Sequence, residues 1–157
     1  MQEKQEPVFV FATANNINQL PPELLRKGRF DELFFIDLPN PIEREEIFKI
    51  HIKKKKRDVE NFDIQSLVDV SDKYTGAEIE IAIDEALYNA YYDKKREPKT
   101  EDVIQAIESI KPLATTMADQ VDALREWAHG RTRVATSEYK ESDEKKIAKS
   151  RNNQLDF

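Results

Sequence analysis

The sequence contains no cysteine, only three glycines, and no hydrophobic run that approaches the roughly 20 residues needed to cross a bilayer. The missing cysteines exclude disulfides and cysteine-ligated metal sites. None of the glycines is followed by lysine, so the chain lacks the Gly-Lys-Ser/Thr core of a phosphate-binding loop. The only two histidines, His51 and His129, are too far apart for the His-Glu-x-x-His motif of a zinc protease. We therefore predict no metal-binding residues.

What is present is a polar, acidic composition. Of the 157 residues, 39% are hydrophobic and 36% are charged, and the net charge is −6. These values predict one or two small domains with a modest core and long solvated helix faces. The acidic balance disfavours non-specific binding of nucleic acid. The polar first residues are not a signal peptide, so we expect a cytoplasmic-type compartment and no membrane partner.

One basic run, residues 53–57, reads Lys-Lys-Lys-Lys-Arg and could suggest a nucleic-acid site. No aromatic residue lies within the run, and acidic residues follow closely. Cations at the end of a helix also complement its dipole. We interpret the run as a solvated helix end and expect no nucleic-acid partner.

Two apolar runs in the first 41 residues predict strands. Residues 8–13 and 33–38 are almost continuously apolar, which suits strands buried on both faces of a parallel sheet. Pro21 and Pro22 can start a short helix between them, and Gly28 can end it in a left-handed conformation. Because two strands and one helix cannot cover their own apolar faces, we expect this segment to belong to a larger α/β domain.

The rest of the chain predicts helices. Apolar periodicity and capping residues indicate four helices within residues 42–112, with Thr75 and Glu78 in a capping box and Thr100 as the cap of the last helix. A further helix is predicted over 115–128 and a disordered polar tail over 135–157. The expected fold class is an α/β fragment with two parallel-type strands and a short helix, followed by an all-α bundle, and mostly α overall.

The segment VFVFATANNINQLPPELLRKGRFDELFFIDLPNP, residues 8–41, resembles the second half of the nucleotide-hydrolysing core of AAA+ ATPases. The helical residues 42–112 are similar in size and order to the lid subdomain of that family. Within it, the chain looks most like a cyanobacterial and plastid-encoded group. The resemblance implies four parts: 1–41 as the end of the large α/β subdomain, 42–112 as the lid, 113–134 as a helical extension, and 135–157 as the tail.

The resemblance assigns catalytic roles to three polar residues. Asn15 matches the sensor-1 position, where an amide at the end of a strand touches the γ-phosphate or orients water. Arg26 and Arg29 match the arginine fingers, whose planar forks suit an anionic transition state. From the residues alone, Asn15 and Asn16 could simply form a turn, and the two arginines could be surface charges at a helix end.

The resemblance also assigns nucleotide-binding residues in the lid. Ile47 and His51 match positions that contact adenine and ribose, and Gly76 with Ala77 matches the stretch beside them. A histidine on an apolar helix face could instead be a core residue. No arginine follows Gly76 and Ala77, and the glutamates there cannot replace a sensor-2 cation.

The resemblance implies a parent protein that couples ATP hydrolysis to remodelling of an unknown macromolecule. It implies ATP and Mg²⁺ as cofactors of that parent, a homo-oligomeric ring expected to be a hexamer, and a cytoplasmic or plastid stroma-type location. We expect neither cofactor to bind this chain alone, because the phosphate-binding half is missing from it. The alternative is a helical interaction module that kept an ATPase-like sequence without its chemistry.

Overall fold

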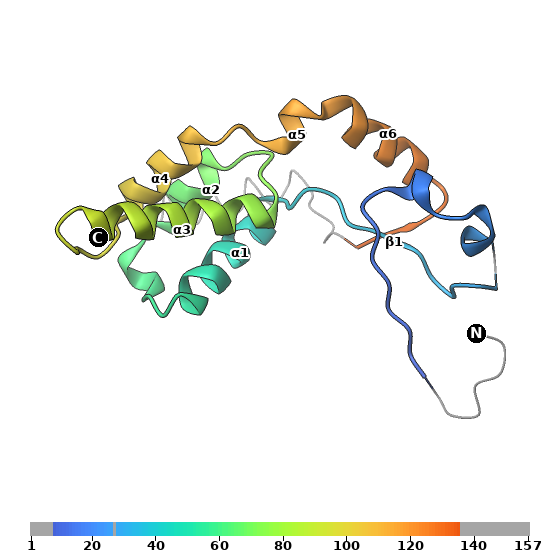
Figure 1. Cartoon of the computed structure of the whole chain (residues 1–157), viewed down its shortest axis with the longest axis horizontal. Helices are drawn as coiled ribbons and strands as arrows, with labels where there is room; N and C mark the ends of the chain where they lie inside the picture. The colour runs from blue at the N-terminus through green and yellow to red at the C-terminus, as the bar shows by residue number, and fades with distance from the viewer. Residues whose placement is uncertain (1–7, 27, 136–157) are drawn as a thin grey trace, which may run out of the picture. The chain divides into compact units, whose positions relative to one another are not determined.

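The computed structural model describes residues 8–26 and 28–135 (Figure 1). The Cα trace divides into two compact units, Met1–Leu33 and Phe34–Phe157, and each is described by itself below. The predicted disordered tail, 135–157, lies outside the described residues apart from Ala135.

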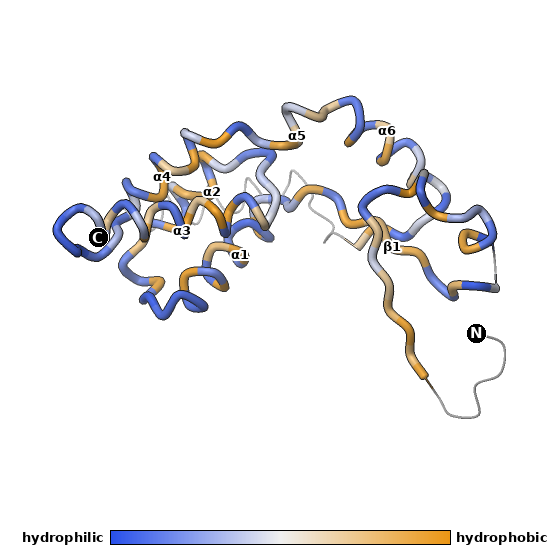
Figure 2. Tube along the Cα trace, viewed as in Figure 1, coloured by the Kyte–Doolittle hydropathy of each residue, from blue (hydrophilic) through white to orange (hydrophobic). Residues whose placement is uncertain are grey.

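The first unit contains two short 3-10 helices, η1 (Ile17–Gln19) and η2 (Pro22–Leu25). The second is the predicted proline-started helix, and Gly28 has the predicted left-handed conformation with φ +89°. The predicted strand over residues 8–13 is wrong, because these residues form no strand and Phe9 is 90% exposed. The apolar run is conspicuous in Figure 2. A strand forms only against a neighbour, and no described residue pairs with this run as a strand.

The second unit begins with strand β1 (Phe34–Phe35), which lies within the predicted strand 33–38. Its partner is β2 (Arg133–Val134), paired in parallel with Phe34 opposite Arg133. The backbone N–H of Ala135 donates to the carbonyl of Phe35 at 2.9 Å and extends the ladder. The predicted fold class is therefore confirmed as mostly helical with a two-stranded parallel sheet, although the second strand comes from the far end of the chain.

The helices between the two strands agree closely with the predicted ones. The first four α-helices and one 3-10 helix are α1 (Pro41–Lys54), η3 (Val59–Asn61), α2 (Ile64–Val70), α3 (Gly76–Tyr92) and α4 (Thr100–Ser109). The last two are α5 (Leu113–Thr116) and α6 (Ala118–Ala128). The single helix predicted over 115–128 is thus broken at Met117, whose φ of −124° and ψ of 35° lie outside helical geometry.

Side chains fix where the helices begin. The predicted capping box at α3 is confirmed: Glu78 accepts from the backbone N–H of Thr75 at 2.8 Å, and the Thr75 hydroxyl accepts from Glu78 N–H. Thr100 is not the cap of α4 as predicted. Asp102 accepts from the N–H of Lys99 at 2.7 Å, and the Thr100 hydroxyl accepts from the N–H of Asp63. Thr100 therefore joins α4 to the start of α2.

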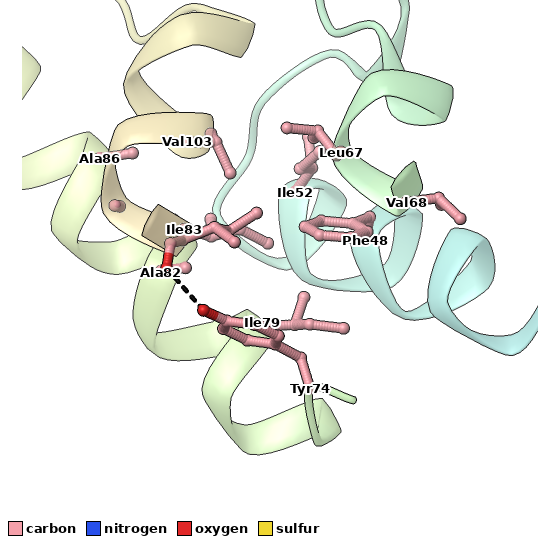
Figure 3. Packing of buried hydrophobic residues seen from close by; sticks show 12 residues of the cluster. Phe48, Ile52, Leu67, Val68, Tyr74, Ile79, Ala82, Ile83, Ala86 and Val103 are labelled. Carbon is pink, nitrogen blue, oxygen red and sulfur yellow. Dashed lines mark hydrogen bonds between the residues drawn. The ribbon is translucent and has the colours of Figure 1, made fainter. Parts of the chain in front are cut away.

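The hydrophobic core lies among α1, α2, α3 and α4, where the side chains in Figure 3 converge. Fully buried members include Phe48, Ile52, Leu67, Ile79, Val103 and Ile107. The buried Tyr74 hydroxyl lies 2.6 Å from the carbonyl oxygens of Ile107 and Ile110, so its one proton always has an acceptor. Tyr74 therefore joins the loop before α3 to the end of α4.

Arg44 is the one charged residue among the buried side chains of the described part. Its guanidinium donates to the carbonyl of Pro39 at 3.1 Å and to that of Val68, at the end of α2, at 3.3 Å. Asp72 lies 3.8 Å away. A cation near the carbonyl end of a helix is favourable, and here it also connects α1 to α2.

The extension formed by α5 and α6 is attached to the segment before α1. Arg125 on α6 donates to both carboxylate oxygens of Asp37 at 2.9 to 3.0 Å. The N–H of Leu113, at the start of α5, donates to Glu78 at 2.6 Å. Polar contacts therefore hold the extension at both ends.

We expect the contribution of Asp102 to stability to depend on pH. The hydrogen bonds from Arg96, at 2.6 and 2.7 Å, lower the pKa of Asp102 below its ordinary 3.8. A carboxylate with a lowered folded pKa stabilises the fold above its unfolded pKa, and this stabilisation is lost as pH falls through the folded pKa. Asp102→Asn should reduce the free energy of unfolding at pH 7 by about 1–2 kcal/mol, because water screens the partly exposed Arg96.

Urea unfolding at several pH values checks this prediction. The difference between wild type and Asp102→Asn should stay constant from pH 7 down to about 4.5 and narrow below the usual carboxylate range. Glu101→Gln, an exposed neighbour on α4, is the matched control and should differ little from wild type at any pH. A gap that does not change at low pH would contradict the assigned role of the Arg96–Asp102 pair.

Candidate functional site

The predicted site residues are divided between the two units. Asn15, Arg26 and Arg29 belong to the first, whereas the predicted lid residues belong to α1 and α3 of the second.

Asn15 lies in a bend directly before η1 and its side chain is exposed. We expected it at the carboxyl end of a buried strand, and this local setting is wrong because residues 8–13 form no strand. The neighbouring Asn16 starts the next turn, where its carbonyl accepts from the N–H of Gln19 at 3.3 Å. The amide of Asn15 is therefore accessible on a short bend.

Arg26 and Arg29 lie at the two ends of one tight turn. The N–H of Arg29 donates to the carbonyl of Arg26 at 3.3 Å, and the N–H of Arg26 donates to the backbone carbonyl of Glu23 in η2. Gly28 gives this turn its positive φ, a conformation that costs other residues energy. A Cβ on Gly28 would meet no atom within 4 Å, so glycine is needed for its backbone and not for space. The turn presents both guanidinium groups, which are exposed.

The structure brings Ile47 and Gly76 together. A Cβ atom built on Gly76 would lie 3.6 Å from Cδ1 and 3.9 Å from Cγ2 of Ile47, so the isoleucine covers the first residue of α3. Ala77 follows on the exposed side of the same turn. Two of the four predicted lid residues, Ile47 and Gly76, thus meet where the middle of α1 faces the start of α3.

His51 lies one turn after Ile47 and faces Glu80 on α3. Its Nδ1 atom is 3.4 Å from Oε1 of Glu80, and Lys54 donates to that same oxygen at 2.8 Å. Nδ1 is buried and makes no hydrogen bond within the described part of the chain. We call His51, Lys54 and Glu80 the His51 cluster. The predicted alternative of a core histidine is only partly met, because 17% of its side chain is exposed.

Two residues of the His51 cluster, Glu80 and Lys54, carry opposite charges. The hydrogen bond from Lys54 is the main cause that lowers the pKa of Glu80, and His51 adds to it. The same hydrogen bond raises the pKa of Lys54. Both groups are ionised at neutral pH. Sequence reasoning missed Glu80 as a partner of His51, because residues on separate helices carry no spacing signal.

Ion pairs account for much of the basic run at 53–57. Lys55 pairs with Asp84 on α3, and Arg57 pairs with Glu97 at 2.7 Å in the loop before α4. Together with Lys54, three of the five cations therefore lie against carboxylates. The run joins α1 to acidic positions that follow it in the sequence.

Two other kinds of feature are absent from the part of the chain that the structure describes. Across residues 8–26 and 28–135, no group of three or more histidine, aspartate or glutamate side chains could hold a metal ion. No helix in this part of the chain is long and apolar enough to span a membrane.

Comparison with known proteins gives the family. The model of the ATPase family associated with various cellular activities (AAA) matches residues 1–38. The AAA domain-containing protein ycf46 of Gracilaria tenuistipitata var. liui is 50% identical over 138 residues, which cover 87% of this chain and 28% of that protein. The proteasome-activating nucleotidase of Sulfurisphaera tokodaii is 39% identical over 104 residues, which cover 66% of this chain and 26% of that protein.

A solved structure shares the fold. The ADP complex of the FIGL-1 AAA domain matches with a TM-score of 0.51 and 21% identity, covering 66% of this chain and 39% of that one. The chain spans less than a third of the length of the two relatives above. The family match over the arginine turn and the agreement with ycf46 through the helical bundle lead to one conclusion: this chain belongs to the AAA+ ATPase family, in its ycf46 group.

Proposed function

We propose that this chain is the sensor, finger and lid portion of a ring-forming AAA+ ATPase. The observation that carries the proposal is the turn that exposes Arg26 and Arg29 inside the segment matched by the AAA family model. Guanidinium groups on a defined turn can stabilise charge that develops on a transferred phosphoryl group. Asn15 would orient the attacking water or touch the γ-phosphate from the exposed bend before η1.

In this proposal residues 1–41 complete the large α/β subdomain, residues 42–112 form the lid, and residues 113–134 form an extension. The compact core of α1 to α4 supports the lid boundary. The unit boundary at Leu33 falls before the proposed end of the large subdomain. Residues 34–41 would therefore act as part of the large subdomain, although they lie in the same compact unit as the helical bundle.

The lid residues fit the nucleoside part of ATP. Ile47 offers an apolar surface against Gly76, which has no Cβ, and His51 adds an imidazole ring one turn after Ile47 on α1. The same residues do not fit Mg²⁺, because they include no carboxylate cluster. We therefore assign base and ribose contacts to this chain and no role in holding the metal. Bound ATP supplies the phosphoryl group, while the chain supplies orientation and cationic donors.

The proposed assembly is a homo-oligomeric ring, a hexamer, in which each arginine turn faces the nucleotide of the next subunit. Head-to-tail interfaces close into rings when their rotation permits it. The proposed substrate is a macromolecule that the ring remodels. The similarity to the proteasome-activating nucleotidase of Sulfurisphaera tokodaii supports a macromolecular substrate. The proposed compartment is cytoplasmic or of the plastid stroma type.

A non-catalytic interaction module is the second candidate. Tyr88, Tyr91 and Tyr92 are 59 to 72% exposed near the end of α3, and the ring centroids of Tyr88 and Tyr92 lie 4.8 Å apart with the rings tilted by 50°. Tyrosine is enriched at protein interfaces. The full-length gene discriminates the candidates, because only the ATPase requires a phosphate-binding loop and a Mg²⁺-binding acidic pair elsewhere in the protein.

We expect the purified 157-residue chain to release no phosphate from ATP and to bind ATP weakly or not at all. Phosphate contacts provide much of the affinity for nucleoside triphosphates, and the chain has no Gly-Lys-Ser/Thr sequence to make them. A phosphate-release assay with the full-length protein as the positive control measures this. ATP turnover above background by the chain alone would contradict the proposal that the chain holds only part of the ATPase site.

A further inference from the structure

The His51 cluster places an anion against one particular nitrogen of an imidazole ring. Oε1 of Glu80 is 3.4 Å from Nδ1 of His51 and is fixed by the 2.8 Å hydrogen bond from Lys54. Nδ1 is buried and has no hydrogen-bond partner among the described residues. Among the described residues, the carboxylate of Glu80 is the one acidic group within 4 Å of this nitrogen.

A neutral histidine carries its proton on one of two nitrogens, and the neighbours of the ring decide which. If Nδ1 were unprotonated, its lone pair would face the lone pairs of an ionised carboxylate across 3.4 Å, which is repulsive. If Nδ1 carries the proton, the positive end of the N–H dipole lies beside the carboxylate, and the contact is attractive although it is too poorly aligned to be a hydrogen bond. Water cannot screen the contact fully, because the ring is mostly buried.

Lys54 strengthens the preference for a proton on Nδ1 of His51. Without it, Glu80 could turn into solvent, since a third of its side chain is exposed. The ammonium group holds the carboxylate in place and keeps it ionised. The orientation of Glu80 thus depends on a residue of α1, the same helix that carries His51.

We propose that Glu80, held by Lys54, keeps the proton of the neutral His51 ring on Nδ1 and leaves Nε2 as a hydrogen-bond acceptor in the nucleotide-binding lid. This inference rests on the proposed function. The lid would then recognise a donor group of the nucleoside, which is either a ribose hydroxyl or the exocyclic amine of adenine. Glu80 and Lys54 are positioning residues that act through His51.

The tautomer of His51 can be read directly by nitrogen NMR of the ¹⁵N-labelled chain. At about pH 9 histidine rings are neutral, while Lys54 remains charged because its pKa is raised. The chain has only two histidines, and the exposed His129 serves as a reference in the same spectrum. We expect His51 to be mainly protonated on Nδ1 and to differ clearly from His129.

Glu80→Ala should shift the tautomer ratio of His51 to that of His129. Lys54→Met should shift it part of the way. Alanine is the strongest helix former, so Glu80→Ala keeps α3 intact, and Glu85→Ala on the same helix is the matched control. The inference is overturned if the tautomer ratio of His51 already equals that of His129 in the wild type. It is also overturned if Glu80→Ala leaves the tautomer ratio of His51 unchanged while the fold is retained.

Titration of the full-length protein with AMP separates this inference from the proposed function, because the chain alone is expected to bind nucleotides weakly or not at all. A change in the Nε2 resonance with AMP that is lost with 2′-deoxy-AMP identifies a ribose hydroxyl as the donor, and a change lost with IMP identifies the amine. If no nucleotide changes the spectrum but His51 has the expected tautomer, the result counts against the nucleotide role of the lid. The effect of Glu80 on the His51 tautomer would still stand.

Discussion

Replacing Arg29 by alanine in the full-length protein should lower kcat by about 10³–10⁵-fold while ATP binding stays nearly intact, as the proposed arginine-finger role requires. The reason is that a finger interacts with charge that develops in the transition state and contributes little to the ground state. Arg26→Ala should act in the same direction. Both arginines are exposed at the ends of one turn, so either substitution should leave the fold stable.

Complementation tests whether the fingers act between subunits. An Arg29→Ala subunit has a working phosphate pocket, and a subunit with a disabled phosphate-binding loop has a working finger. Mixing them should restore part of the turnover. Asn15→Ala should also lower turnover, but without the same dependence on assembly. Mixed rings that form yet remain inactive, or normal kcat in Arg29→Ala alone, would leave the arginines as surface charges of a turn.

Phe48→Ala should have the largest effect on stability, lowering the free energy of unfolding by about 3–5 kcal/mol. Phe48 on α1 is completely buried among residues of α2, α3 and α4, so its loss leaves a cavity that its neighbours cannot fill. A small domain is stabilised by only about 5–15 kcal/mol, so the variant should be close to unfolding at physiological temperature.

Ile50→Ala is the matched control, because Ile50 lies on the same helix but is 58% exposed. It should change the free energy of unfolding by about 0.5 kcal/mol or less. Urea denaturation followed by far-ultraviolet circular dichroism measures both variants. Equal losses for the two substitutions would mean that the core is not where the structure has it.

The elements that the sequence predicted well are those determined locally. The capping box of Thr75 and Glu78, the left-handed Gly28 and the apolar periodicity of α1 to α4 depend on neighbours within a few residues. The failures depend on distant residues. Residues 8–13 carry a strand-like pattern but have no partner strand among the described residues, and the hydroxyl of Thr100 accepts from the N–H of Asp63, 37 positions away in the chain.

The same division applies to the candidate site. The turn of Arg26 and Arg29 follows from proline before it and glycine within it, so its location was predictable. The contact between Ile47 and Gly76 and the role of Glu80 beside His51 depend on how α1 packs against α3. Spacing along one helix contains no information about its neighbour, which is why Glu80 was recognised only as a residue that cannot replace a cation.

The pairing of β1 with β2 has a consequence for the order in which the protein folds. Phe34 lies beside Arg133, and the whole helical bundle is synthesised between them. Helical contacts are mostly local and form fast, whereas strands distant in sequence pair late. During synthesis the backbone of Phe34 and Phe35 therefore stays unpaired with β2 until the last described residues leave the ribosome. A pulse-labelling hydrogen-exchange experiment should detect α1 to α4 as protected before the Ala135 amide.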